Sequence, residues 1–179
     1  FVIDLLDIKE DNGKYHFLTK RFDRCLDKRL HYQSCLTLLK KEDGDKGYYL
    51  DIVSIIRSYS KNINYELKEL FKRIAFYIAI NNTDNHLRNI SFIIEGSQMK
   101  LSPCYDINPC PYKSVFATSF NDDGNDNFNE AIKNAKYFNL NENEAREIIN
   151  RTIKIISDNY FKLCDKYKIN KSVAEEMFK

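Results

Sequence analysis

The chain has 179 residues, of which 43% are hydrophobic and 30% charged, and its formal net charge at pH 7 is +2. These values exclude a disordered chain, indicate one globular domain, and give no overall electrostatic attraction for nucleic acid. No apolar run approaches the ~20 residues of a membrane-spanning helix and no signal peptide opens the chain, so we expect a cytoplasmic protein that binds neither membranes nor, directly, nucleic acid.

The first residues predict a β-hairpin. Residues Phe1 to Asp7 are apolar and compatible with a strand, and residues 14–22 form a second such run. The acidic segment 9–13 between them ends in Asn12-Gly13, which is a strong signal for a hairpin turn.

Three helices are predicted next. Residues 30–39 form a short helical candidate, and the polar segment 43–47 breaks it. Residues 49–59 carry apolar side chains at helical spacing. The third helix, with Asn64 as its expected N-cap, has a broad apolar stripe and should therefore be central and buried. The polar run 81–83 ends it.

A second hairpin follows, with strands over 90–94 and 98–101 and a turn at 95–97. It would place Asn89 just before one strand and Asp106 just after the other. Two residues distant in sequence are therefore expected to converge.

The remainder is predicted to be irregular and then helical. Segment 107–129 is irregular, and helices are expected over 129–138, 142–167 and 171–178. The sequence therefore predicts a mainly α, α+β fold with short β-hairpins, in a single domain.

Asp84, Asn89 and Asp106 are the residues with the clearest chemical pattern. In phosphoryl transfer a carboxylate accepts the proton of the attacking hydroxyl, while an Asn oxygen and a second carboxylate hold Mg²⁺. Asp84 and Asn89 are five residues apart, and Asp106 follows the hairpin. The structural alternative is that Asp84 and Asn85 only cap a turn, as Asp and Asn often do.

The neighbouring polar residues allow more than one role. His86 is a base or, more simply, a residue that braces the loop, and Arg88 is either a cation for the transferred phosphate or a solvated loop residue. The histidines and cysteines show no zinc-site spacing, and the acidic run 121–127 lacks the ligand order of a calcium loop.

Four segments together resemble the C-terminal region of HipA-like serine/threonine kinases, the toxins of bacterial toxin–antitoxin modules. They are Lys20-Arg21-Phe22-Asp23-Arg24, Arg29-Leu30-His31, the run from Asn82 to Phe92, and the run from Leu101 to Ile107. The resemblance covers about residues 15 to 110, and the helical remainder suits the all-α lobe of the family.

The resemblance implies a role for each matching residue. Asp84 would be the catalytic base, and Asn89 and Asp106 would be the Mg²⁺ ligands. His86 would support the catalytic loop, and Arg88 would lie near the phosphates of ATP.

The resemblance also implies an ATP hinge at the N-terminal end. The backbone of Lys20 and the ring of Phe22 would contact adenine, and Asp23 would lie near the ribose. Ile107 follows the metal-binding Asp, where relatives also carry an apolar residue. Family members phosphorylate protein serines or threonines, some of them in aminoacyl-tRNA synthetases, and many are held by a DNA-binding antitoxin.

The family's N-terminal lobe, with its phosphate-covering loop and ATP-binding Lys, has no counterpart before Lys20. We therefore expect residues 1–24 to form a hinge hairpin and residues 25–179 the helical lobe, with the N-terminal lobe outside this chain. Two alternatives stay open: a small-molecule kinase of the aminoglycoside phosphotransferase type, and a non-catalytic, kinase-like binding module.

Overall fold

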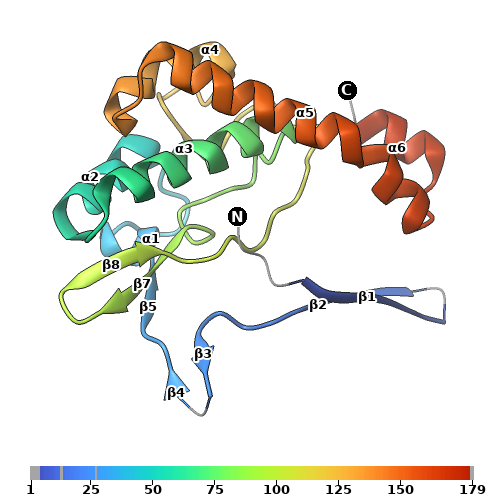
Figure 1. Ribbon diagram of the computed structural model, residues 1–179, viewed down its shortest axis with the longest axis horizontal. Coiled ribbons are helices and arrows are strands. Elements are labelled where there is room, and N and C mark those ends of the chain that lie inside the picture. The colour runs from blue at the N-terminus through green and yellow to red at the C-terminus, as the bar shows by residue number, and fades with distance from the viewer. Residues whose placement is uncertain (1–4, 13, 27, 178–179) are drawn as a thin grey trace.

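The structure is a computed structural model that describes residues 5–12, 14–26 and 28–177. The N-terminal hairpin pairs β1 (Leu5–Asp11) with β2 (Lys14–Thr19) in antiparallel fashion and projects away from the central sheet, below α6 in the view of Figure 1. The first strand thus extends into the segment predicted as a turn, as far as Asp11, and Asn12 lies in the turn; the second strand ends at Thr19, before Phe22. Residues 1–4 and Gly13 lie outside the described part of the chain.

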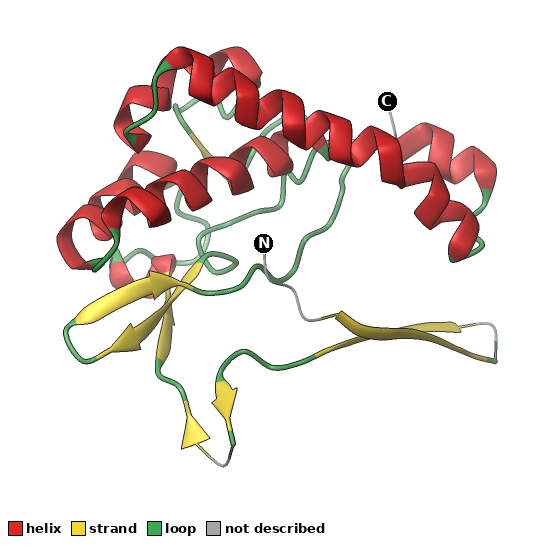
Figure 2. Ribbon diagram, in the orientation of Figure 1, coloured by secondary structure: helices red, strands yellow, loops and turns green. Residues whose placement is uncertain are grey.

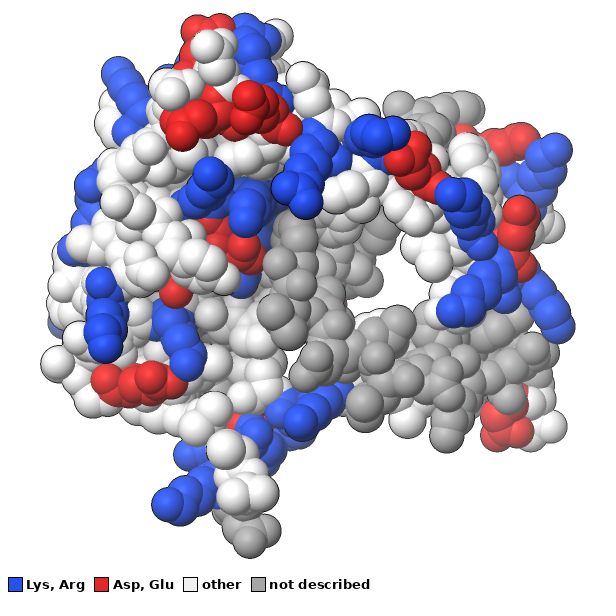
Figure 3. Space-filling model, viewed as in Figure 1, with Lys and Arg blue, Asp and Glu red and all other residues white. Residues whose placement is uncertain are grey.

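A second, smaller hairpin follows, with β3 (Arg24–Cys25) paired to β4 (Lys28–Arg29). Arg24 lies opposite Arg29, and Cys25 opposite Lys28, so the pairing brings cations together. Figure 3 shows these blue side chains gathered on the projection at the bottom of the view. None of the described residues of this hairpin belongs to the hydrophobic core cluster.

The central sheet is three-stranded and antiparallel, in the order β5-β7-β8. It contains β5 (Tyr32–Ser34), β7 (Ser91–Glu95) and β8 (Gln98–Leu101). The hairpin of β7 and β8 was predicted correctly. The helix predicted over residues 30–39 is wrong in its first half, because Tyr32–Ser34 pairs with β7; only α1 (Cys35–Leu38) is helical, and the Ser34 side chain caps it.

Two long helices pack against this sheet. Helix α2 (Tyr49–Tyr59) has the predicted bounds, and α3 (Ile63–Ala79) is buried along most of its length, as its stripe predicted. The predicted cap is wrong: Asn62 is the N-cap residue. The Oδ1 atom of Asn64 instead accepts a hydrogen bond from Asn139 Nδ2 at 2.7 Å.

The C-terminal helices complete the helical layer that lies above the sheet in Figure 2. The helix predicted over 129–138 is divided into α4 (Phe128–Asn134) and the 3₁₀ helix η1 (Ala135–Phe138). Asn139 then adopts a left-handed conformation, with φ of 56°. Helix α5 (Glu142–Lys166) begins with a capping box, and α6 (Lys171–Met177) follows it.

Two short strands tie the region before α2 to the segment after the sheet. Strand β6 (Gly47–Tyr48) pairs in parallel with β9 (Thr118–Ser119), which interrupts the segment predicted as irregular. A Cβ atom on Gly47 would lie 2.6 Å from Thr118 Oγ1 and 2.8 Å from Leu87 Cγ. Glycine is therefore required for this close approach.

The core joins α1 to α5, the sheet and η1, and large side chains such as Phe71, Phe92 and Phe138 are buried in it. Within the described residues, no helix has both the length and the apolar character needed to cross a membrane. The architecture is α+β and mainly helical, as predicted.

Candidate active site

The loop after α3 presents its side chains alternately to the core and to solvent. Asn81 has a left-handed φ of 52° and ends the helical path. Asn82, Thr83, Asn85 and Leu87 are buried, whereas Asp84 and Arg88 are exposed. The buried side chains anchor the loop to the core, and the charged side chains of Asp84 and Arg88 lie at the surface.

Several buried polar atoms of this loop lack a partner within the described residues: Asn82 Nδ2, Thr83 Oγ1 and His86 Nδ1. Buried polar groups in folded proteins are nearly always hydrogen-bonded, and exceptions concentrate where a protein binds water or ligands. The loop therefore carries unused hydrogen-bonding capacity.

Asn89 and Asp106 are in direct contact, which is the convergence that the sequence predicted. Asn89 precedes β7 and Asp106 follows β8, so the β7–β8 hairpin brings them together. The Nδ2 atom of Asn89 donates a hydrogen bond to Asp106 Oδ2 at 2.9 Å.

The backbone of Asp106 is left-handed, with φ of 53°, and its Oδ1 atom accepts a hydrogen bond from Asn108 Nδ2 at 2.8 Å. A non-glycine residue in this conformation is uncommon and marks a constrained position. Asn108 in turn donates its backbone N–H to Asn82 Oδ1 at 3.4 Å, which links the Asp106 segment to the loop after α3.

The donor chemistry of this pair fits a hard divalent cation. An amide oxygen and a carboxylate are ligands that Mg²⁺ accepts, and Mg²⁺ commonly takes only one or two protein ligands, with waters and phosphates as the others. Within the described residues, no cluster of three or more His, Cys, Asp or Glu side chains is arranged to hold a metal. Asn89 and Asp106 thus bring together two oxygen-bearing side chains of the type that Mg²⁺ accepts.

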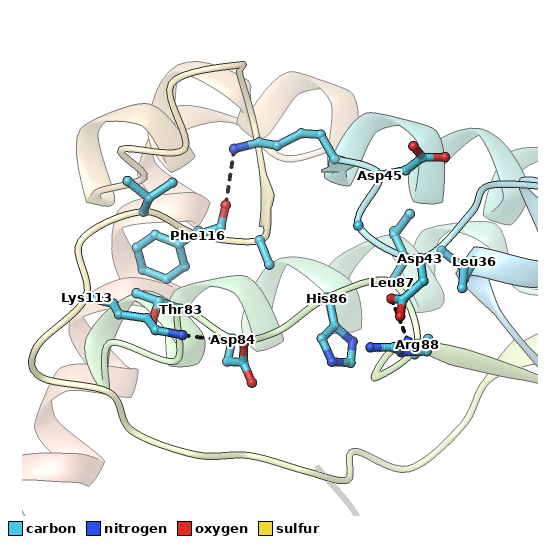
Figure 4. A pocket seen from close by; sticks show the side chains of 14 residues that line it. Leu36, Asp43, Asp45, Thr83, Asp84, His86, Leu87, Arg88, Lys113 and Phe116 are labelled. Carbon is cyan, nitrogen blue, oxygen red and sulfur yellow. Dashed lines mark hydrogen bonds and ion pairs between the residues drawn. The ribbon is translucent and has the colours of Figure 1, made fainter.

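Asp84 lines a surface pocket of about 350 Å³ (Figure 4). The pocket is bounded by the loop after α3, by the 43–46 segment before β6 and by residues 113–117. Asp84 Oδ1 lies 3.9 Å from Lys113 Nζ, and both side chains are mostly exposed. Asn89 and Asp106 are not among the residues that line this pocket.

His86 joins the two ends of the loop through its backbone. Its N–H donates to the carbonyl of Asp84 at 2.9 Å, and its carbonyl accepts from the N–H of Asn89 at 2.8 Å. The imidazole lines the same pocket. These bonds agree with a supporting role for His86.

Arg88 is engaged in an ion pair with Asp43, at 2.6 Å between Nη1 and Oδ1. The hydrogen bond from this guanidinium holds the pKa of the Asp43 carboxyl below its usual value. The carbonyl of Arg88 accepts a hydrogen bond from Tyr105 Oη at 2.7 Å. Arg88 thus connects the 43–46 segment and the Asp106 segment to the loop after α3.

The predicted hinge lies beside the Asp106 segment. The Phe22 ring is stacked on Tyr105 with centroids 5.8 Å apart, and it meets Tyr32 edge-on at 5.3 Å. Ile107 is half-buried, and Lys20 is exposed beyond the end of β2. The chain therefore connects the hinge to the Asn89–Asp106 pair through aromatic packing.

Asp23 is buried and held by two arginines. Arg21 donates two hydrogen bonds to its carboxylate, at 2.8 and 2.6 Å, and Arg24 Nη1 lies 3.3 Å away. The hydrogen bonds from Arg21 lower the pKa of Asp23. A ribose hydroxyl would have to share this carboxylate with the guanidinium groups.

Tyr105, Asn108 and Lys113 are site residues to which the sequence assigned no role. Tyr105 and Asn108 flank Asp106 and Ile107, so their position beside the predicted metal ligand Asp106 was the available signal. Lys113 lies in an irregular segment without periodicity, and nothing in the sequence pointed to it.

Comparison with known proteins gives a consistent picture. A family model described as "HipA-like C-terminal domain" matches residues 3–160. A protein of Haemophilus influenzae named "Putative kinase" is 29% identical over 120 residues, which are 60% of this chain and 35% of that protein. The chain thus spans about a third of that curated relative.

The fold is similar to a chain of the solved toxin–antitoxin complex of Shewanella oneidensis MR-1, which contains HipA, HipB and operator DNA. The TM-score is 0.74 at 16% identity, and the match covers 99% of this chain and 50% of that chain. At this identity the likeness establishes the fold. The predicted HipA-like, mainly helical lobe is confirmed.

Proposed function

The chain belongs to the HipA-like C-terminal domain family, and from this premise we propose that it is the catalytic lobe of a cytoplasmic serine/threonine protein kinase. The observation that carries the proposal is the contact of Asn89 with Asp106 at 2.9 Å, next to a loop that exposes Asp84. A carboxylate base followed five residues later by a metal-binding Asn, with a second Asp beyond, is the arrangement that kinases use.

Asn89 and Asp106 would hold Mg²⁺ through the amide oxygen and the carboxylate. Mg-ATP, when bound, supplies the γ-phosphoryl group that the reaction transfers to the acceptor hydroxyl. Asn108 orients the carboxylate of Asp106 through the hydrogen bond to Oδ1. Phe22, packed on Tyr105, would offer an apolar ring to the base.

Asp84 would orient the acceptor and take its proton. Its carboxylate is exposed in the pocket, so a serine or threonine side chain can reach it from solvent. The acceptor hydroxyl loses its proton to Asp84 as its oxygen forms the new bond to phosphorus. His86 maintains the loop during this step through its two backbone hydrogen bonds.

The partners are proposed from the same relatives. The Shewanella complex contains HipB and operator DNA, and we infer that a DNA-binding antitoxin likewise holds the protein that contains this chain. The family resemblance favours a protein substrate, with aminoacyl-tRNA synthetases as the first candidates to test.

The test uses the full-length protein and compares Asp84→Asn and Asp106→Asn with Asp123→Asn, an exposed carboxylate of the 121–127 loop. We expect both site variants to lower transfer of labelled γ-phosphate to protein Ser or Thr by about 10²- to 10⁴-fold, and the control to match wild type. Electron paramagnetic resonance with Mn²⁺ gives a second readout. Asp106→Asn should weaken Mn²⁺ binding, whereas Asp84→Asn should retain it.

Normal phosphorylation by both site variants would overturn the proposal. Transfer to a sugar hydroxyl and not to protein would instead support a small-molecule kinase. Absence of both Mn²⁺ and Mg-ATP binding in the wild-type full-length protein would indicate a non-catalytic binding module.

A further inference from the structure

The cations around the pocket are not equally available. Lys46 Nζ donates to the carbonyl of Phe116 at 3.2 Å, and Arg88 is paired with Asp43 at 2.6 Å. Of the cations in the described part of the chain, Lys113 is the one that forms an ion pair with Asp84. Figure 4 shows Lys113 and Asp84 pointing toward each other, while Arg88 points toward Asp43.

The backbone that carries Lys113 is fastened to the base of the catalytic loop. Asn81 Nδ2 donates to the carbonyl of Lys113 at 2.8 Å and to the carbonyl of Cys110 at 2.7 Å. The N–H of Cys110 donates back to the carbonyl of Asn81 at 3.0 Å. Asn81 precedes Asp84 by three positions in the sequence, so one residue helps to set the positions of both partners of the ion pair.

A second attachment lies on the other side of the pair. The N–H of Ala117 donates to the carbonyl of Thr83 at 2.9 Å, and Thr118 enters β9. The segment from Cys110 to Ala117 is therefore held to the catalytic loop at both ends. Lys113 is carried between these attachments, and its position beside Asp84 follows from the fold.

The exposure of the pair indicates a role other than folding. The Lys113 and Asp84 side chains are 63% and 60% exposed. Exposed ion pairs of this kind contribute little to stability because water and salt screen them. The backbone of Lys113 is held in place although its ion pair adds little stability. This combination suits a role for Lys113 in positioning Asp84 beside the pocket.

We propose that Lys113 is the cation that positions the Asp84 carboxylate for catalysis. This inference rests on the proposed function. During transfer the acceptor oxygen forms a bond to phosphorus, the bond from phosphorus to ADP breaks, and ADP leaves with the electron pair. The hydroxyl proton moves to Asp84, and Lys113 stays protonated throughout and keeps the carboxylate turned toward the pocket.

The experiment measures γ-phosphoryl transfer by the full-length protein from labelled ATP to total protein of the host cell, with Mg-ATP varied. We expect Lys113→Met to lower the saturated rate by about 10- to 100-fold, as a misplaced catalytic group does, with KM for Mg-ATP within about twofold. Lys113→Arg keeps a cation at this position and should recover most of the rate.

Two controls separate positioning from folding. Lys154→Met removes an exposed lysine from a similar ion pair on α5, at 3.0 Å from Asp158, and should leave the rate unchanged. The thermal unfolding midpoint of Lys113→Met should equal that of the wild type. Because Lys113 acts through Asp84, adding Lys113→Met to Asp84→Asn should cause no further loss of rate.

The outcomes distinguish this inference from the proposed function. A wild-type rate for Lys113→Met, an additive double variant, or a raised KM with an unchanged saturated rate would each overturn the role of Lys113. If Asp84→Asn is inactive in the same assay, the proposed function stands in all three cases. Full activity of Asp84→Asn would instead overturn the proposed function itself.

Discussion

Asp126 is a carboxylate that the fold buries just before α4. Its side chain is 8% exposed, and its Oδ1 atom accepts the N–H of Phe120 at 3.1 Å. Burial raises the pKa of Asp126 to about 6. A charged form is disfavoured at this position because it loses its hydration.

This residue predicts a pH dependence of stability. Since the pKa is higher in the folded than in the unfolded chain, the folded state binds more protons between pH ~4 and ~6, and stability falls as pH rises through this window. Asp126→Asn keeps the oxygen that accepts from Phe120 and should remove this decline. The free energy of unfolding in urea, compared at pH 4.5 and pH 8, measures this decline, and Asp123→Asn, a change at an exposed carboxylate, is the control. An Asp126→Asn curve that falls as steeply as wild type would contradict the prediction.

For single residues, the sequence predicted that Asn89 and Asp106 lie close together, but it did not predict the ion-pair partner of Arg88. Asn89 and Asp106 could be paired in advance because a predicted β-hairpin lies between them. The opposite holds for Arg88, which was expected near the phosphates and is paired with Asp43. Its partner belongs to a polar loop 45 residues earlier, and no local pattern indicates such a contact.

At the scale of elements, the β7–β8 hairpin rests on a buried polar network from α3. Glu66 Oε2 accepts the N–H of Leu101 at 2.9 Å, and Arg73 donates to the carbonyl of Ser102 at 2.8 Å. Arg73 is also paired with Glu69 at 3.1 Å, and all three charged residues are buried. The network fixes the chain just before Asp106.

Replacing Arg73 should therefore affect both stability and the metal site. Arg73→Met leaves Glu69 without this buried partner and should cost about 3–5 kcal/mol of unfolding free energy. It should also weaken Mn²⁺ binding, because the segment that carries Asp106 loses its anchor. Chemical denaturation and Mn²⁺ titration measure the two effects. Lys68→Met, an exposed change on the same helix, is the control, and equal behaviour of both variants would refute the assignment.

Elements with a strong local pattern were predicted well, and elements that depend on a distant partner were not. The bounds of α2 follow from its apolar period, which packing against one core face imposes. Strand β5 was taken as helix because its three residues show no period, and only pairing with β7 makes them extended. The 3₁₀ form of η1 likewise depends on the left-handed turn at Asn139.

At the scale of the whole molecule, the chain divides into a core and projecting hairpins. The buried cluster includes residues from α1 through α5 and the central sheet. By contrast, the side chains of Phe17 and Leu26 are 65% and 97% exposed. The β1–β2 and β3–β4 hairpins extend away from the body in Figure 1. Cooperative unfolding should therefore involve the core without the hairpins.

Limited proteolysis tests this division. Trypsin should first cut between Lys20 and Arg29, where exposed basic residues occur outside the core. The C-terminal product should keep the thermal midpoint of the uncut chain. First cuts within α3 or α5, or a product that unfolds at lower temperature, would show that the hairpins are part of the cooperative unit.

The turn of the β7–β8 hairpin has a practical consequence. Glu95, Gly96 and Ser97 are exposed at one end of the hairpin, while Asn89 and Asp106 meet beyond the other end. A fluorophore or a short epitope inserted at this turn would stay remote from the ligand pair, since surface turns accommodate added residues. The lobe thus offers an attachment point for spectroscopic or pull-down studies of the intact protein.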